Sequence, residues 1–270
     1  MKNKDCTVVV CSCDAYADLL PAFSRLWRRF WADCPFEVVL VTESAPTGLE
    51  CFDRVIACGK GGSWCSRLVE SLRQVATPAV LLLCDDYFLE SPVDTELVLR
   101  RLSQLLSSGA ANLRMIPNPK PVRANSEPSS AVDGLLEYRP FTAYRVATQA
   151  GLWDRAFLAA LAAGKSSIWE FERYGSFDPA ASARRMLVTP SKEFPFVDAV
   201  HKGHWETWGL EVCRANGIDV SGTGRTLPPL RVRITEGLKG MAFRLLPTTA
   251  LVKFQNRFSL GAKEKPQKRG

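Results

Sequence analysis

The chain has 270 residues, of which 46% are hydrophobic and 23% are charged. This length suits one large domain or one domain with an appendage, and the composition excludes a chain that is disordered throughout. The formal net charge of +7 is distributed unevenly. Residues 231–270 contain ten lysines and arginines and two acidic residues, a net charge of +8, so residues 1–230 carry −1. We therefore predict a main domain over residues 1–230 and a basic C-terminal extension over residues 231–270.

The nine cysteines indicate reduced thiols and not a disulfide framework. Their number is odd, no Cys-x-x-Cys pair occurs, and several lie inside apolar runs. The first residues show no signal-peptide pattern, and the longest apolar stretch, residues 78–84, is far shorter than the roughly 20 residues that span a bilayer. We therefore expect a protein that is soluble or peripheral to a membrane, with a cytoplasmic location.

Apolar runs alternate with helical patterns over the first 90 residues. Continuous apolar runs predict buried strands over residues 7–13, 35–43, 54–58 and 78–84. Apolar residues at helical spacing predict helices over residues 19–30 and 63–76, and Ser63 is the expected N-cap of the second. This alternation predicts an α/β fold of the Rossmann type, in which helices flank a mostly parallel sheet. Ligands of such sheets bind beyond the carboxyl ends of the strands.

The pattern changes after residue 90. Helical spacing predicts helices over residues 96–106, 154–163 and 166–177. Short apolar or β-branched runs predict strands over residues 112–116, 138–149, 183–190 and 194–200. Residues 117–130 contain four prolines and little apolar content, which predicts a loop.

Two adjacent acids, Asp85 and Asp86, directly follow the apolar strand predicted over residues 78–84. Carboxylates in that position are costly unless a cation or a hydrogen-bond network meets them. Their hard oxygens suit Mg²⁺ or Mn²⁺, and such an ion would hold a substrate diphosphate and stabilise charge on a departing phosphate. The alternative interpretation is a strand-ending aspartate that caps the next turn.

A glycine-rich turn over residues 59–63 opens the second predicted helix. Free backbone N–H groups at a helix start suit a phosphate or a polar sugar edge, although a surface turn explains the glycines equally well. The turn is not a Walker loop, because no Gly-Lys-Ser/Thr ends it. Arg67, one turn into the helix, is expected either to hold a diphosphate or to form an ordinary surface salt bridge.

The order of these segments resembles the donor half of GT-A glycosyltransferases, and among them the inverting family-2-like bacterial enzymes of surface polysaccharide synthesis. The resemblance is carried by TVVVCSCDAY, EVVLVTE, GKGGSW and VLLLCDDYF, and it covers residues 7–90 and, more loosely, residues 138–175. In that family an acidic motif, usually Asp-x-Asp, ends the fourth strand and binds the metal and the nucleotide diphosphate. Here Asp85-Asp86-Tyr87 occupies this position.

The resemblance implies a nucleotide-sugar donor at the carboxyl ends of the first strands. The donor-site residues that it implies are Cys11, Ser12, Asp14, Ser63, Arg67, Asp85 and Asp86. Of these, Asp85 and Asp86 would also hold Mn²⁺ or Mg²⁺. Tyr16 is an alternative to Asp14 for contact with the base or ribose, and a loop-capping role is the other interpretation of Asp14.

An inverting transfer also needs a general base on the acceptor side. The segment WEFE, residues 169–172, opens a predicted helix, and the flat face of Trp169 can stack on a sugar ring. Residues two apart on a helix point about 200° apart, so only one glutamate can serve; we favour Glu172, with Glu170 as the alternative. The resemblance places Gln149 near the acceptor. The competing interpretation of Glu170 and Glu172 is that they are acids at a helix start, where they complement the helix dipole.

We therefore predict transfer of a sugar from a nucleotide-sugar donor to a hydroxyl of a saccharide or lipid-linked acceptor, in cell-surface polysaccharide synthesis. One alternative is a sugar-phosphate nucleotidyltransferase, although CSCDAY lacks the Gly-rich, Arg-containing signature typical of that class. A non-enzymatic nucleotide- or saccharide-binding module is the other. His201 and His204, the only histidines, are candidates for a metal site or for surface packing.

The C-terminal segment alternates apolar residues with lysine and arginine. This pattern is typical of an interfacial helix, and it predicts peripheral contact with an anionic membrane at the inner face of the plasma membrane. A solvated tail and a nucleic-acid patch are the alternatives. The sequence contains no DNA or RNA recognition motif, so we expect no nucleic-acid partner.

Overall fold

The structure is a computed structural model that describes residues 2–46, 49–118 and 124–229, together with single positions at 250, 253 and 257. Apart from those three positions, the predicted basic extension lies outside the described residues. Within the described residues, no helix has both the length and the apolar character needed to cross a bilayer.

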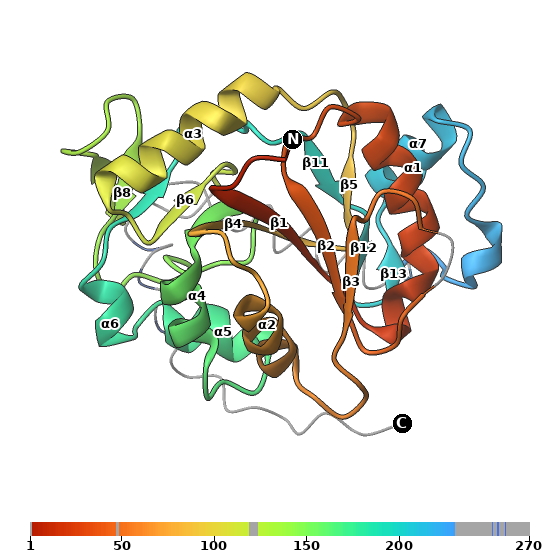
Figure 1. The fold of residues 1–270 in the computed structure, drawn as a ribbon, viewed down its shortest axis with the longest axis horizontal. Helices are drawn as coiled ribbons and strands as arrows, with labels where there is room; N and C mark the ends of the chain where they lie inside the picture. The colour runs from red at the N-terminus through yellow and green to blue at the C-terminus, as the bar shows by residue number, and fades with distance from the viewer. Residues whose placement is uncertain are drawn as a thin grey trace.

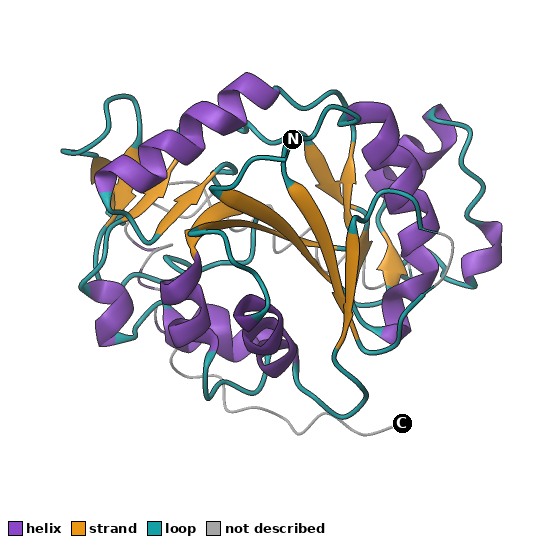
Figure 2. Cartoon of the chain, in the orientation of Figure 1, coloured by secondary structure: helices purple, strands orange, loops and turns teal. Residues whose placement is uncertain are grey.

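A nine-stranded sheet forms the centre of the molecule, with helices on both of its faces (Figures 1 and 2). The strand order is β3-β2-β1-β4-β9-β6-β10-β8-β7. The strands are β1 (Cys6–Cys11), β2 (Glu37–Thr42), β3 (Arg54–Ala57), β4 (Ala79–Cys84), β6 (Asn112–Arg114), β7 (Ser126–Pro128), β8 (Leu136–Tyr138), β9 (Gly151–Asp154) and β10 (Met186–Val188).

Most strands of this sheet run in one direction. β1 pairs in parallel with β2 and β4, β2 with β3, and β6 with β10. β9 is antiparallel to both β4 and β6, and β8 is antiparallel to both β10 and β7. Seven of the nine strands therefore share one direction and only β9 and β8 oppose it. The predicted α/β fold with a mostly parallel sheet is confirmed.

The helices lie in two layers that cover the faces of the sheet (Figure 1). The helical elements are η1 (Asp14–Leu19), α1 (Leu20–Phe30), α2 (Trp64–Arg73), α3 (Thr95–Ser108), α4 (Arg155–Ala162), α5 (Ile168–Gly175), α6 (Pro179–Ser182), α7 (Thr207–Ala215) and η2 (Ser221–Thr223). Side chains of Ser63 and Ser167 cap the starts of α2 and α5, and Gly109 ends α3 in the left-handed conformation.

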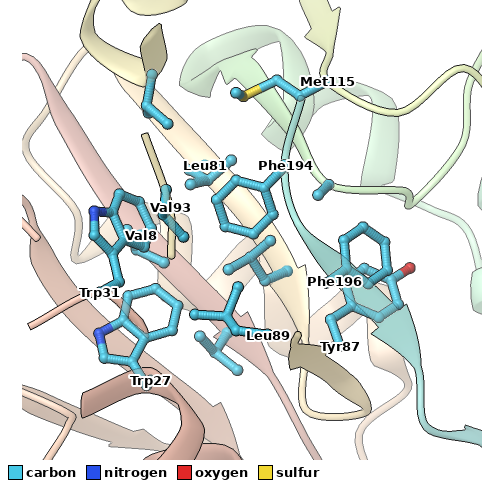
Figure 3. Packing of buried hydrophobic residues seen from close by; sticks show 14 of the residues in the cluster. Val8, Trp27, Trp31, Leu81, Tyr87, Leu89, Val93, Met115, Phe194 and Phe196 are labelled. Atoms are coloured by element: carbon cyan, nitrogen blue, oxygen red, sulfur yellow. The ribbon is translucent and has the colours of Figure 1, made fainter. Parts of the chain in front are cut away.

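Alternate side chains of the central strands enter two separate cores, which explains why these strands are apolar at nearly every position. In β4, Leu81 and Leu83 face the core beneath α1 and α3, whereas Val80 and Leu82 face the core beneath α2 and α4. Aromatic rings fill the first core (Figure 3), where Trp31 meets Phe194 edge to face at 5.5 Å between centroids.

A short antiparallel ribbon of β5 (Tyr87–Leu89) and β11 (Phe196–Asp198) stands beside the main sheet. β5 begins directly after Asp86, and its first residue, Tyr87, is paired with Asp198. The Tyr87 and Phe196 rings stack at 4.2 Å (Figure 3). A further hairpin, β12 (Val200–His201) and β13 (His204–Trp205), follows at once. The ribbon therefore brings a late part of the chain to the end of β4.

Two predictions about the middle of the chain were wrong. The strand expected over residues 138–149 ends at Tyr138, because Phe141 and Tyr144 have φ values of 55° and 58°, which a strand does not allow. The loop expected over residues 117–130 contains β7 at residues 126–128. Pro128 is tolerated there because β7 is the edge strand of the sheet.

Candidate functional site

The carboxyl ends of β1, β2, β3 and β4 meet on one edge of the sheet, because these four neighbours are parallel. We call this the acid edge, defined by residues 11–14, 42–44, 58–63 and 84–86, which follow or end the four strands. All seven donor-side residues that the sequence singled out lie on it or at the start of α2.

Asp85 and Asp86 form the centre of the acid edge. The Asp85 side chain is 5% exposed, and its Oδ2 accepts a hydrogen bond from Ser12 Oγ at 2.5 Å. Burial raises the pKa of Asp85 to about 7, against the opposing effect of the Ser12 hydrogen bond. Burial, followed by the negative charges of Asp85 and Asp198, raises the pKa of Asp86 well above its ordinary value. Ionising both carboxyls is therefore costly without a cation.

Asp198, at the end of β11, is a third carboxylate at this centre. The N–H of its neighbour Ala199 donates to the Asp86 backbone oxygen at 2.8 Å, which fixes the two segments together. Burial raises the pKa of Asp198, and the nearby His201 opposes that shift. In the sequence Asp198 was noticeable only as an acid near the two histidines, because the β5–β11 pairing that brings it to Asp86 is a long-range one.

Arg225 supplies positive charge beside these acids. Its guanidinium pairs with both carboxylate oxygens of Asp18, at 2.6 and 2.7 Å, and lies 4.4 Å from the centroid of the Tyr16 ring. The charge of Arg225 lowers the pKa of both Asp85 and Asp86, although less than burial raises them. Sequence reasoning missed Arg225, because no local pattern links it to residues more than 200 positions earlier.

Arg67 links two segments of the acid edge through hydrogen bonds. It is 8% exposed, and its Nη1 donates to Glu43 Oε1 at 3.1 Å and to the Gly62 oxygen at 2.7 Å. The other oxygen of Glu43 accepts from the Asp14 N–H at 3.0 Å. Arg67 therefore forms a largely buried salt bridge, and together these hydrogen bonds join the segments that follow β1, β2 and β3. Contact of Arg67 with a diphosphate stays a prediction.

The remaining donor-side residues have local partners. The Asp14 carboxylate accepts from Ser44 N–H and Oγ, at 3.0 and 2.8 Å, which lowers its pKa. Ser63 Oγ accepts from the Ser66 N–H at 3.1 Å and so caps α2. The Cys11 side chain is buried in the core beneath α2, while its backbone oxygen accepts from the Asp85 N–H at 3.2 Å.

Glu172 is half-buried, and hydrogen bonds link it to the residue that follows the acid pair. Thr148 donates to its Oε1 twice, from the backbone N–H and from Oγ1, both at 2.7 Å. The Tyr87 hydroxyl donates to the Thr148 oxygen at 3.3 Å, so a continuous chain runs from Glu172 through Thr148 to the residue after Asp86. Burial raises the pKa of Glu172, and the Thr148 hydrogen bonds oppose the shift.

Glu170, by contrast, is part of the helix start. Its Oε2 accepts from the Ser166 N–H at 2.7 Å, while its own N–H donates to the Ser167 hydroxyl at 3.2 Å. This reciprocal arrangement resembles a capping box and lowers the pKa of Glu170. On the same helix the Trp169 ring is half exposed, with the Arg173 guanidinium 5.9 Å from its centroid.

Gln149 is half-buried, one residue beyond Thr148. No hydrogen bond joins its side chain to any part of the chain that the structure describes. Its amide is therefore available to a ligand from the segment that also holds Glu172. His201, in the adjoining hairpin, is exposed, and the buried Nδ1 of His204 has no hydrogen-bond partner among the described residues.

The acid edge has the donor chemistry that a hard divalent cation requires. Within the described residues no group of three or more His, Cys, Asp or Glu side chains has the arrangement of a complete metal cage. Mg²⁺ and Mn²⁺ at nucleotide sites commonly take one or two carboxylates and complete their shell with phosphate oxygens and water. The buried Asp85 and the half-buried Asp86, both with raised pKa values, fit that partial set, because a bound cation would offset the cost of ionising them.

No protein-family model and no curated protein matches the chain. Among solved structures it is similar to the mannosyltransferase PcManGT from Pyrobaculum calidifontis in complex with GDP-Man and Mn²⁺, with 12% identity, a TM-score of 0.46, and coverage of 96% of this chain and 88% of that one. It is also similar to S. aureus TarS 1–349 in complex with UDP-GlcNAc, with 16% identity, a TM-score of 0.45, and coverage of 97% and 76%.

A cytidylyltransferase from Leptospira borgpetersenii is similar as well, with 9% identity, a TM-score of 0.41, and coverage of 80% of this chain and 96% of that one. The chain spans 59% of another TarS 1–349 structure and 46% of a longer TarS chain. The expected resemblance to glycosyltransferases is thus found, at identities and TM-scores too low to carry an inference about activity.

Proposed function

We propose that this protein is a nucleotide-sugar-dependent glycosyltransferase. The observation that carries the proposal is the presence of two separate, largely buried acidic sites, with a chain of hydrogen bonds that runs from the second to the residue directly after the first. Asp85 and Asp86 form the first site at the end of β4, and Glu172 forms the second, with Thr148 and Tyr87 between them. Transfer of a sugar requires these two functions, since charge must be offset at the leaving diphosphate and a proton must be removed from the acceptor.

The donor is proposed to lie along the acid edge. Asp85 and Asp86 would hold Mn²⁺ or Mg²⁺ together with the diphosphate, and the ion would stabilise the negative charge of the departing nucleotide. Ser12 orients Asp85 through its 2.5 Å hydrogen bond. Arg67 and Glu43 keep the ends of β2 and β3 in place beneath the nucleotide.

Glu172 is proposed as the general base. Both hydrogen bonds from Thr148 go to Oε1, so Oε2 keeps no hydrogen-bond partner among the described residues and is free to accept a proton. Burial raises the pKa of Glu172, which makes the carboxylate a stronger base than an exposed glutamate. In an inverting step the acceptor oxygen bonds to the anomeric carbon, the bond from that carbon to the diphosphate breaks, and the hydroxyl proton passes to Glu172.

The acceptor is proposed to be a saccharide, free or lipid-linked, as in cell-surface polysaccharide synthesis. The exposed face of Trp169 suits stacking on a sugar ring, and the free amide of Gln149 suits hydrogen bonds to hydroxyls. A location at the inner face of the plasma membrane belongs to the same proposal. It depends on the basic residues 231–270 of the sequence.

The test uses the full chain and separates the two sites. Thermal unfolding is measured with a panel of nucleoside diphosphates and nucleotide sugars, each with and without Mn²⁺, and nucleotide release is measured from the sugar that binds. We expect metal-dependent stabilisation that Asp86→Asn removes. We expect Glu172→Gln to keep donor binding and to lower turnover about 10²–10⁴-fold. Glu170→Gln, on the same helix, is the matched control and should keep activity.

Three results would overturn the proposal. An absence of response to every nucleotide would favour a binding module of another kind. Release of pyrophosphate from a nucleoside triphosphate and a sugar phosphate would identify a nucleotidyltransferase. Full turnover in both Asp86→Asn and Glu172→Gln would place the chemistry elsewhere in the protein.

A further inference from the structure

A polar cavity lies on the edge of the sheet opposite the acid edge. It has a volume of about 320 Å³, and its walls include Gly109, Glu137, Arg145, Ser182, Arg184 and Arg185. Gly109 precedes β6, and Arg184 and Arg185 precede β10. Both strands run in the same direction as β4, so their starts lie at the edge away from Asp85. We call this cavity the arginine pocket; its walls include residues of α6 and β8, two elements that Figure 1 labels.

Arg145 gives the arginine pocket a buried positive charge. Its side chain is 1% exposed, and it donates to three backbone oxygens: Tyr138 at 3.3 Å, Ala181 at 2.5 Å and Arg184 at 2.5 Å. A guanidinium has five N–H groups, so two of them have no acceptor among the described residues. No carboxylate of the described residues lies within ion-pair distance of it, and burial lowers the pKa of Arg145 to about 10.

The other residues in the walls of the arginine pocket also offer more hydrogen-bond donors than acceptors. Glu137 is the acid in the wall, and it is already paired with Arg185 at 2.8 Å. Arg184 is partly exposed, donates from Nη2 to the Gly109 oxygen at 3.3 Å, and lies 3.8 Å from the Asp154 carboxylate. The Ser182 hydroxyl oxygen is buried without a hydrogen-bond partner among the described residues. Three guanidinium groups, one carboxylate and one free hydroxyl therefore surround the space.

We propose that the arginine pocket binds a small molecule with a phosphate group, at a site separate from the proposed donor edge. A phosphate oxyanion accepts several charge-assisted hydrogen bonds at once, which the unused N–H groups of Arg145 and the Ser182 hydroxyl can supply together. The volume is at the lower end of the range of about 300–1,000 Å³ for small-molecule sites, so the ligand is a phosphate monoester with a small organic part.

The test measures binding to the full chain by calorimetry, with inorganic phosphate and glycerol 3-phosphate as probes and glycerol at equal ionic strength as the blank. The test variants are Arg184→Gln and Ser182→Ala, which leave the backbone oxygens that hold Arg145 unchanged. Arg73→Gln is the matched control, since Arg73 is an exposed arginine paired with Glu70 on α2. We expect binding by wild type and the control, and a loss of about tenfold in each test variant.

The outcomes separate a phosphate-binding site in the arginine pocket from binding elsewhere and from a general effect of charge. No binding of either probe to wild type would overturn the proposal, and so would equal binding by wild type, Arg184→Gln and Ser182→Ala, as expected for phosphate held at the acid edge. Binding that Arg73→Gln weakens as much as Arg184→Gln does would show a general charge effect. Binding only to phosphatidic acid vesicles, with no response to the soluble probes, would also overturn the proposal, because the partner would then be a lipid surface and not a small soluble phosphate.

Discussion

Replacement of Gly209 by alanine tests the contact between α7 and Ala199, the residue whose N–H is hydrogen-bonded to Asp86 in the acid edge. Gly209 is the third residue of α7, and a Cβ atom there would lie 2.6 Å from Ala199 Cα, 2.7 Å from its oxygen and 2.9 Å from its Cβ. Contacts below 3.0 Å with backbone atoms cannot be relieved by rotating a side chain. Restoring an ordinary separation of 3.4 Å requires α7 and the Ala199 segment to move apart by about 0.8 Å, the difference between the two distances.

Two opposing effects decide the sign of the change in stability. An alanine is preferred to glycine inside a helix by up to about 1 kcal/mol, and less near its first turn. Forced overpacking of a buried contact costs about 1–3 kcal/mol. We therefore expect Gly209→Ala to lower the free energy of unfolding by about 1–2 kcal/mol. We also expect it to weaken metal-dependent donor binding, because the Ala199 N–H that would move donates to the Asp86 oxygen.

The assay is urea unfolding followed by tryptophan fluorescence, with donor binding measured on the folded protein. Gly222→Ala is the control, since no atom lies within 4 Å of the added Cβ and the φ of Gly222 is not positive. An unfolding free energy for Gly209→Ala equal to or above that of wild type would refute the reasoning, because helix propensity would then outweigh the contact with Ala199.

Three more predictions concern charge, packing and capping. The pKa of Glu172 is raised in the folded protein, so the stability that its protonation contributes is present below the ordinary pKa of 4.5 and is lost as pH rises through the raised pKa. In urea unfolding measured over a pH series, Glu172→Gln should therefore reduce the dependence of the unfolding free energy on pH in this range. Leu81→Ala, at a fully buried position of β4, should lower the unfolding free energy by about 2–5 kcal/mol in the same assay, and a loss below 1 kcal/mol would contradict the packing described. Ser63→Ala removes the cap on the Ser66 N–H and should cost about 1 kcal/mol, with Ser63→Asp restoring it.

The first half of the fold was predictable because its signals are local. Strands β1, β2 and β4 are mostly apolar, since both of their faces are covered, and the helix between β3 and β4 begins at a serine cap. The acid pair was predictable for the same reason, because its place follows from the end of β4. The assignment of roles to Glu172 and the other predicted site residues stays a prediction.

Long-range contacts account for most of what the sequence did not reveal. The segment after Tyr138 contains aromatic and β-branched residues and was therefore expected to be a strand. In the structure, the Arg145 side chain is instead buried and donates hydrogen bonds to the backbone oxygens of Ala181 and Arg184, which are distant from it in the sequence. Asp198 and Arg225 reach the acid centre through a β-ribbon and an ion pair with distant partners, and neither contact has a periodic signature.

The position of β9 in the sheet means that β4 and β6 are joined only through a strand that comes later in the sequence. β9 lies between β4 and β6, although both of those strands precede it in the sequence. Until residues 151–154 are available, one edge of β4 remains open and β6 has no partner on that side. A fragment that ends before β9 would contain Asp85 and Asp86 but would expose an apolar strand edge, which favours association between chains. The pairings of β9 with β4 and β6 join segments that are distant in the sequence, and non-local pairings of this kind are slow to form.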